Sequence, residues 1–291
     1  TTVATCMGAN SAFGNAGATF TQGLSALISV LVAWHLGWIA LITMAKPLRG
    51  SGAVSLPDFL QRRYGSTTRL IAAVVSLVFL VNSTAAQVAA VGNIFSTFNL
   101  MAAAPAIIVS GVINILYTVF GGLYAVAITD TIQAVLLIGG VCIAVPIVAF
   151  NQAGGVSSVI AQTDPKMLDV FNGFDPLVTL GWILSYCLGA GSHAAYSQRI
   201  FASKDEKTAF WGSIWSNLIA FLAGGIIMIT VLTAPIIFPE MTNGETFVPM
   251  MIYTFFPPMI KGLIIAALFG LVMSTADSFL LMVGTTIAND I

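Results

Sequence analysis

Long apolar runs that almost lack charged residues dominate this sequence. The run from Gly262 to Thr286 contains a single charged residue, Asp277. A helix needs about 20 consecutive apolar residues to cross a bilayer. Over the 291 residues only 7% are charged, whereas soluble domains carry about 25%. Unbroken apolar runs also exclude a β-barrel, whose strands would alternate apolar and polar residues. The sequence therefore predicts an all-α polytopic membrane protein.

Eight runs are predicted to cross the membrane, roughly over residues 3–20, 23–45, 67–97, 103–120, 125–150, 176–198, 209–235 and 259–286. Basic residues gather in two connections that four crossings separate: Lys46, Arg49, Arg62, Arg63 and Arg69 in one, and Arg199, Lys204 and Lys207 in the other. The connections 151–175 and 236–258 are acidic. The positive-inside rule therefore places the basic connections in the cytoplasm of a multi-pass plasma-membrane protein.

The last span gathers its polar side chains on one face. At about 100° per residue, Ser274, Asp277, Ser278 and Thr285 share a side of the helix, with Thr275 at its margin. Hydroxyl and carbonyl oxygens suit a hard alkali cation, and an ionisable residue in a span indicates a functional site. A single hydroxyl could instead bond back to its own helix or join neighbouring helices. The whole cluster favours an ion site.

The first span has an unusual centre, because glycine and small polar residues fill it from Gly8 to Gly17. Glycine gives the backbone freedom to unwind, and unwound backbone at membrane depth must line a cavity or be buried in protein. Its free carbonyls could hold Na⁺. An equally good alternative is close helix packing along Gly8, Ala12 and Ala16.

Other polar and aromatic side chains lie within the spans, and some of them are candidates for a solute site or an ion path. Trp182 and Tyr186 are four residues apart and share a helix face beside small residues, so they could clamp an organic solute. Asp130 could be an ion relay or only a partner for an arginine. His35 is predicted to be a packing histidine. In the third span Gln87 and its polar neighbours, Asn82, Ser83 and Thr84, can face the bundle interior.

Enzymatic functions have little support in the sequence. It contains no phosphate-binding Gly-Lys loop, no zinc-ligand spacing and no defensible pair of nucleophile and base. The net charge of −1 gives no indication of nucleic-acid binding. We therefore expect a protein that is not an enzyme, has no organic cofactor, and interacts with a small organic solute and the lipid bilayer. The oligomeric state is left open.

Four patches resemble the sodium:solute symporters, which include proline, pantothenate, sialic acid and sugar carriers. The patches are Ser55-Leu56-Pro57-Asp58-Phe59 with Arg63-Tyr64-Gly65; Gly121-Gly122 through Thr129-Asp130 and Gln133; Gln198-Arg199 through Ala202, Lys204-Asp205 and Ala209; and Met273-Ser274-Thr275 with Asp277-Ser278. The resemblance implies the leucine-transporter-type inverted-repeat fold in one transmembrane domain. Residues 1–150 would form the first five-helix repeat and 176–291 an incomplete second repeat, so that the chain is a truncated bundle.

The resemblance also implies residue roles. Carbonyls of Ala9, Ala12 and Leu271 and hydroxyls of Ser274 and Thr275 would bind Na⁺ as the coupling ion. Leu271 replaces a smaller residue, and Ser11 stands where proline carriers have an aspartate. The solute would bind near Asn10, Ser11, Trp182 and Tyr186. An ion path or gate would use Asp130, Asp277 and Ser278.

The predicted function is Na⁺-coupled symport of a small organic solute, an amino acid such as proline. Pantothenate is the alternative solute. Two other readings are a transporter-like sensor domain of a membrane histidine kinase and a channel.

Overall fold

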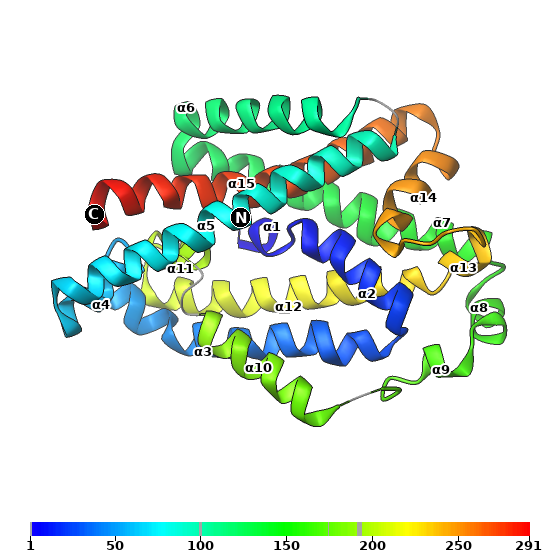
Figure 1. Ribbon diagram of the computed structural model, residues 1–291, viewed down its shortest axis with the longest axis horizontal. Coiled ribbons are helices and arrows are strands. Elements are labelled where there is room, and N and C mark those ends of the chain that lie inside the picture. Colours follow the sequence, from blue (N-terminus) through cyan, green and yellow to red (C-terminus); the bar gives the residue numbers. More distant parts are fainter. Residues whose placement is uncertain (1, 99–100, 174, 191–193) are drawn as a thin grey trace.

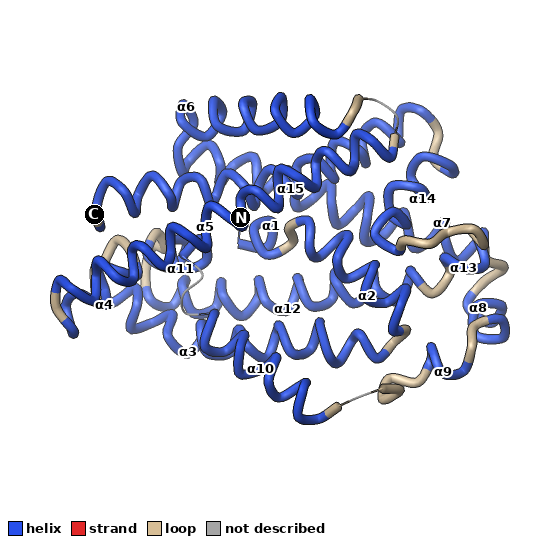
Figure 2. Tube along the Cα trace, viewed as in Figure 1, coloured by secondary structure: helices blue, strands red, loops and turns tan. Residues whose placement is uncertain are grey.

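The computed structural model describes residues 2–98, 101–173, 175–190 and 194–291, which form a bundle of helices without a strand among the described residues (Figures 1 and 2). The first half comprises α1 (Thr2–Cys6), η1 (Asn10–Gly14), α2 (Asn15–Gln22), η2 (Leu27–Val32), α3 (Ala33–Gly50), α4 (Leu56–Tyr64), α5 (Ser66–Thr97), α6 (Ala103–Leu137), η3 (Ile138–Ala144) and α7 (Val145–Gln152). The second half comprises α8 (Val156–Gln162), α9 (Pro165–Leu168), α10 (Pro176–Ala190), α11 (Ala194–Phe201), α12 (Glu206–Val231), α13 (Ala234–Ile237), η4 (Gly244–Thr246), α14 (Phe247–Phe255) and α15 (Pro258–Asp290).

Each predicted span corresponds to helix in the structure. Five helical stretches of the described residues are long and apolar enough to cross a membrane: Leu27–Gly50, Ser66–Ser96, Ala103–Gln152, Glu206–Ile237 and Pro258–Asp290. The stretch Ala103–Gln152 contains two predicted spans, because Gly122 has φ 59° and ψ −169° and turns the chain there. The predicted first span is broken into short pieces, and the sixth corresponds to the shorter helix α10 followed by α11.

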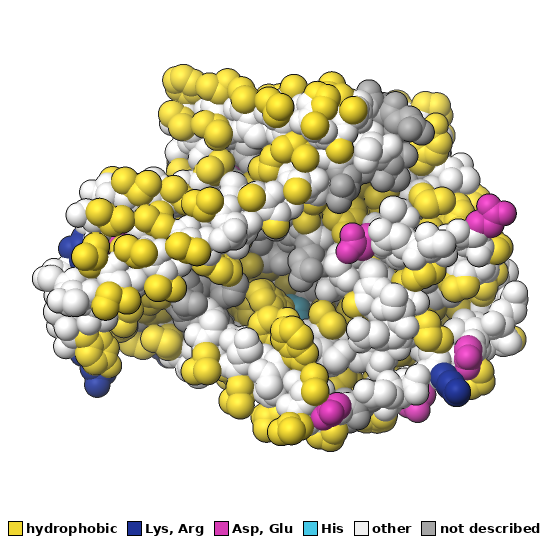
Figure 3. Space-filling model, in the orientation of Figure 1, with side chains coloured by type: hydrophobic (Ala, Val, Ile, Leu, Met, Phe, Trp, Pro, Cys, Tyr) yellow, Lys and Arg dark blue, Asp and Glu magenta, His cyan; other side chains and the backbone are white. Residues whose placement is uncertain are grey.

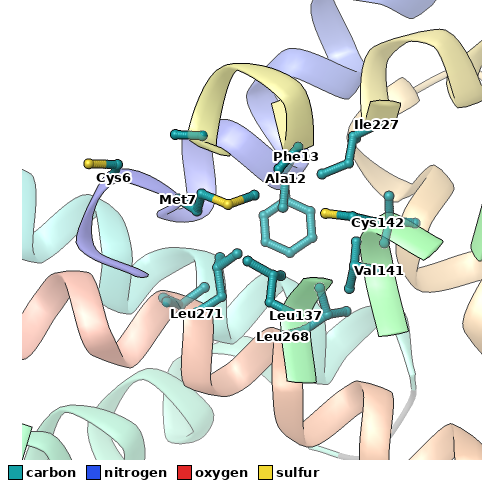
Figure 4. Close-up of a cluster of buried hydrophobic side chains, with 14 of the residues drawn as sticks. Cys6, Met7, Ala12, Phe13, Leu137, Val141, Cys142, Ile227, Leu268 and Leu271 are labelled. Carbon is teal, nitrogen blue, oxygen red and sulfur yellow. The ribbon is translucent and has the colours of Figure 1, made fainter. Parts of the chain in front are cut away.

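The broken first span lies in the middle of the bundle. Its segment α1 packs against α12 and α15, which cross on either side of it (Figure 1). The ring of Phe13 lies among Met7, Leu137 and Leu268 in a cluster of buried apolar side chains (Figure 4). Apolar packing therefore fixes the residues on both sides of the break, so the break is held in one place.

Charges of opposite sign lie at opposite ends of the bundle, as the sequence predicts. The helices α4 and α11 lie at one end, and α8, α9 and α13 lie at the other (Figure 1). On the face shown in Figure 3, Lys and Arg side chains lie at the first end, and Asp and Glu side chains lie mostly toward the second end, where a Lys or Arg side chain is also visible. At the basic end, Asp290 Oδ1 accepts a hydrogen bond from Ser55 Oγ at 2.7 Å and pairs with Arg69 at 3.3 Å. This cluster ties α4, α5 and α15 together.

One predicted connection is more ordered than the sequence suggests. Residues 236–258 were expected to form an outward-facing loop, but they contain the helix α14. Its side chains Phe247, Met251 and Ile252 are fully buried in the main apolar cluster. The connection folds back onto the bundle because burying these large apolar side chains is favourable.

Candidate functional site

Gly8 lies at the break in the first span, between two other helices. The helix α1 ends at Cys6, and Met7 and Gly8 are not helical. A Cβ atom added to Gly8 would lie 2.9 Å from Thr275 Oγ1 of α15 and 3.1 Å from Gln87 Oε1 of α5. Contacts this short leave no room for a side chain, so glycine is required for the close approach.

Three of the residues predicted to bind Na⁺ are neighbours at this break. The Leu271 carbonyl accepts hydrogen bonds from Ser274 Oγ at 3.0 Å and from Thr275 Oγ1 at 3.4 Å. Thr275 Oγ1 also donates to the Thr5 carbonyl of α1 at 3.3 Å. Both hydroxyls bond to the backbone of their own helix, and the Thr275 hydroxyl also bonds to α1. Two carbonyls and two hydroxyls thus gather in one place, which is a donor set suited to a hard cation.

The other two predicted Na⁺ residues have different surroundings. Ala12 is fully buried in the main apolar cluster. The Ala9 N–H donates to Gln87 Oε1 at 2.9 Å. The first-span residues that contact Thr275 here are Thr5, through its carbonyl, and Gly8. Ala9 and Ala12 are therefore not brought to the Thr275 hydroxyl, and the ligand roles of all five residues stay predictions.

A buried charged network lies next to these hydroxyls. Arg199 pairs with the fully buried Asp130 at 2.8 Å and donates to Ser278 Oγ at 2.7 Å. Ser278 Oγ in turn donates to Asp277 Oδ1 at 3.3 Å and lies 3.4 Å from Thr5 Oγ1. The structure therefore gives Asp130 an arginine partner, one of its two predicted roles. The sequence placed Arg199 in a basic connection between two spans, and the structure corrects this. Arg199 belongs to α11, and its nearly buried side chain supplies the counter-charge that the buried Asp130 requires.

A cavity of about 260 Å³ opens beside the break. Two of the predicted solute residues, Ser11 and Tyr186, line it. Trp182 is not among the described residues that line the cavity. Its side chain is 48% exposed and stacks on Tyr186, with ring centroids 5.8 Å apart. The side chain of Asn10 lies outside the part of the chain that the structure describes. The predicted aromatic pair is therefore present, but only Tyr186 reaches the cavity.

Sequence reasoning missed most of the aromatic wall. Trp34, Phe79 and Phe279 line the cavity, and the Trp34 ring meets Tyr186 edge to face at 4.9 Å. They come from α3, α5 and α15, and no sequence spacing relates them. His35 also lines the cavity, with Nδ1 2.6 Å from Asn217 Oδ1. In Figure 3 a histidine side chain is visible inside a hollow of the molecule.

A second cavity of about 520 Å³ lies on the other side of the break. Its lining includes Ala9 and Phe13 of the first span and Asn243, Glu245 and Thr246 near the acidic end of the bundle. Ala86 and Gln87 of α5 line both cavities. Gln87 therefore lies between the two cavities, and the second one extends from this point toward the acidic end.

A bundle of membrane helices with its first span broken against hydroxyls of its last span has the leucine-transporter-type fold. A solved structure of a Na⁺-coupled sialic acid symporter, in a substrate-bound outward-open state, superposes with a TM-score of 0.80 at 21% identity. The match covers 100% of this chain and 65% of that one. The predicted fold class is confirmed.

The chain belongs to the sodium:solute symporter family, whose sequence model matches residues 1–291. It is 27% identical to the osmoregulated proline transporter OpuE of Bacillus subtilis over 94% of this chain and 58% of that protein. It is 28% identical to the sodium/pantothenate symporter of Escherichia coli over 100% of this chain and 62% of that protein. The chain thus spans about three fifths of the length of these relatives. The predicted family and the multi-pass plasma-membrane location are confirmed.

Proposed function

We propose that the protein takes part in Na⁺-coupled symport of a small organic solute. The observation that carries this proposal is the meeting of Thr5, Leu271, Ser274 and Thr275 oxygens at the break in the first span, beside a cavity. Na⁺ would bind between α1 and α15 and stabilise the arrangement in which the solute binds next to it. One charge that crosses a potential of 100 mV supplies about 2.3 kcal/mol before any concentration gradient is counted.

The lining of the cavity supports a solute without a strong net charge. Among its described lining residues there is no Lys, Arg, Asp or Glu, and His35 is the one titratable imidazole. A net charge buried there would lack a counter-charge from the protein, which is costly. Aromatic rings of Trp34, Tyr186 and Phe79 offer an apolar wall. These features favour a zwitterion such as proline, and pantothenate, whose anionic charge would need Na⁺ beside it, is the alternative.

The charged network gives the ion a route away from the site. Asp277 and Ser278 lie one turn beyond Ser274 on α15, on the way to the basic end of the bundle. The pair Asp130–Arg199 contacts Ser278 there. We assign these residues to the ion path, in which Arg199 would exchange its partners as the cation passes.

The test is uptake by the full-length protein in proteoliposomes with an inward Na⁺ gradient and labelled proline, pantothenate and sialic acid. Concentrative uptake of one solute, abolished when K⁺ replaces Na⁺, is the expected result. Binding of a solute without any uptake would favour a sensor. Na⁺ flux that does not depend on a solute would favour a channel, and either outcome would contradict symport.

A further inference from the structure

The two partners of one helical hydrogen bond are separated at the break in the first span. In a continuous α-helix the Ala9 N–H would donate to the carbonyl of Thr5. Here the Ala9 N–H donates to Gln87 Oε1 at 2.9 Å. The Thr5 carbonyl accepts from Thr275 Oγ1 at 3.3 Å and from the Tyr196 hydroxyl at 3.5 Å. Side chains of α5, α11 and α15 therefore provide the partners for both the donor and the acceptor of this bond.

Gln87 is placed to control the first half. Its side chain is only 9% exposed, and its amide lies within 3.1 Å and 3.2 Å of the position that a Cβ of Gly8 would take. A backbone N–H at membrane depth must have an acceptor, because hydrocarbon offers none and an unsatisfied donor is costly there. Without the oxygen of Gln87, the acceptor that the helix itself offers to Ala9 is the Thr5 carbonyl. The break would then close.

Closing the break would affect the ion, because the Thr5 carbonyl is also the first-span oxygen nearest to the Thr275 hydroxyl among the described contacts. A carbonyl engaged by the Ala9 N–H would be a weaker ligand for Na⁺. We propose that Gln87 is a positioning residue, which keeps the first span open at Gly8 and keeps the Thr5 carbonyl directed at α15 rather than at the Ala9 N–H, without touching the ion. This inference rests on the proposed Na⁺ site between α1 and α15.

Binding of ²²Na⁺ to the purified protein without solute tests the proposal. Gln87→Met keeps the length of the side chain and removes the acceptor, so the Na⁺ concentration for half-saturation should rise about tenfold, equivalent to about 1.4 kcal/mol. Gln87→Glu keeps an acceptor for the Ala9 N–H and should stay within about threefold of the parent protein. A matched control is Asn82→Leu on the same helix, because Asn82 is exposed and bonds only to the Val78 carbonyl in the described structure. This variant should leave Na⁺ binding unchanged.

Two outcomes would overturn the proposal. Equal weakening by Gln87→Met and Gln87→Glu would mean that Gln87 acts through packing, and unchanged binding in Gln87→Met would mean that the ion site does not depend on it. Amide hydrogen exchange of the peptide around Met7–Ala9, measured in Na⁺-free buffer, adds a readout that needs no ion. Exchange should slow in Gln87→Met as the helix closes, and unchanged or faster exchange would contradict the proposal. If the parent protein binds no Na⁺, the proposed function fails, while the exchange result still decides the role of Gln87.

Discussion

At the scale of single residues, Gly8 lies so close to Thr275 that a Cβ added to Gly8 would be 2.9 Å from Thr275 Oγ1. The Thr275 hydroxyl bonds to two carbonyls from two helices, Leu271 and Thr5. It can do so because Gly8 carries no side chain that would displace it. Both features concern a few atoms, and each leads to a prediction about Na⁺ affinity.

Replacing either hydroxyl of the last span should weaken Na⁺ binding. For Ser274→Ala or Thr275→Ala we expect the Na⁺ concentration for half-maximal binding to rise roughly tenfold, or about 1.4 kcal/mol. Protein yield should change little, since removing a hydroxyl leaves a small void. The control is Thr285→Ala on the same helix, whose hydroxyl bonds back to the Leu281 carbonyl at 2.9 Å. Equal Na⁺ affinity in all three variants would remove the site from α15.

A methyl group at Gly8 should have a larger effect. In Gly8→Ala the new Cβ would lie 2.9 Å from Thr275 Oγ1, so either the hydroxyl or the backbone must move away. We expect a loss of Na⁺ affinity of more than about tenfold. Gly284→Ala is the control, because a Cβ there meets nothing within 4 Å. Titrating Na⁺ binding in both variants checks the prediction, and similar affinities would show that the close approach is not needed.

At the scale of helices, the buried pair of Asp130 and Arg199 joins α6 to α11. Removing one member of a buried pair leaves an uncompensated charge and costs about 3–5 kcal/mol. We therefore expect Asp130→Asn or Arg199→Gln to lower the thermal stability of the protein in detergent strongly. The double variant should recover much of the loss, since neither charge then remains. Additive losses in the double variant would indicate that the two residues act independently.

Helices also show how far the sequence could predict this structure. The one-sided polar face of residues 274–278 follows from helical geometry alone, so the hydroxyls of the proposed ion site could be named from the sequence. The glycines of the first span indicated a break as one of two equal alternatives. They did not indicate which carbonyl meets Thr275, because the register between α1 and α15 depends on the packing of Met7, Phe13 and their neighbours. Trp34 could not be assigned to the cavity for the same reason: its partner Tyr186 lies on α10, which packs along α3.

At the scale of the whole molecule, the charge asymmetry predicts which end faces the cytoplasm. In a Cys187→Ser background the remaining cysteines, Cys6 and Cys142, are buried. Lys204→Cys lies just after α11, a helix of the basic end, and Thr242→Cys lies between α13, a helix of the acidic end, and η4. A membrane-impermeant maleimide added to intact cells should label Thr242→Cys only, and Lys204→Cys should react after permeabilisation. The reverse pattern would invert the topology.

The cluster of Ser55, Arg69 and Asp290 has a further consequence for the molecule as a whole. It fastens three helices at the basic end, whereas the second cavity extends toward the acidic end. In the orientation that the positive-inside rule predicts, these contacts hold the helices together on the cytoplasmic side, and the larger cavity lies toward the outside. We expect a competitive inhibitor to reach the site from the acidic end, through the second cavity. We expect loss of the Ser55, Arg69 and Asp290 contacts to appear first as a leak of ions through the cytoplasmic end, while the binding site itself stays intact.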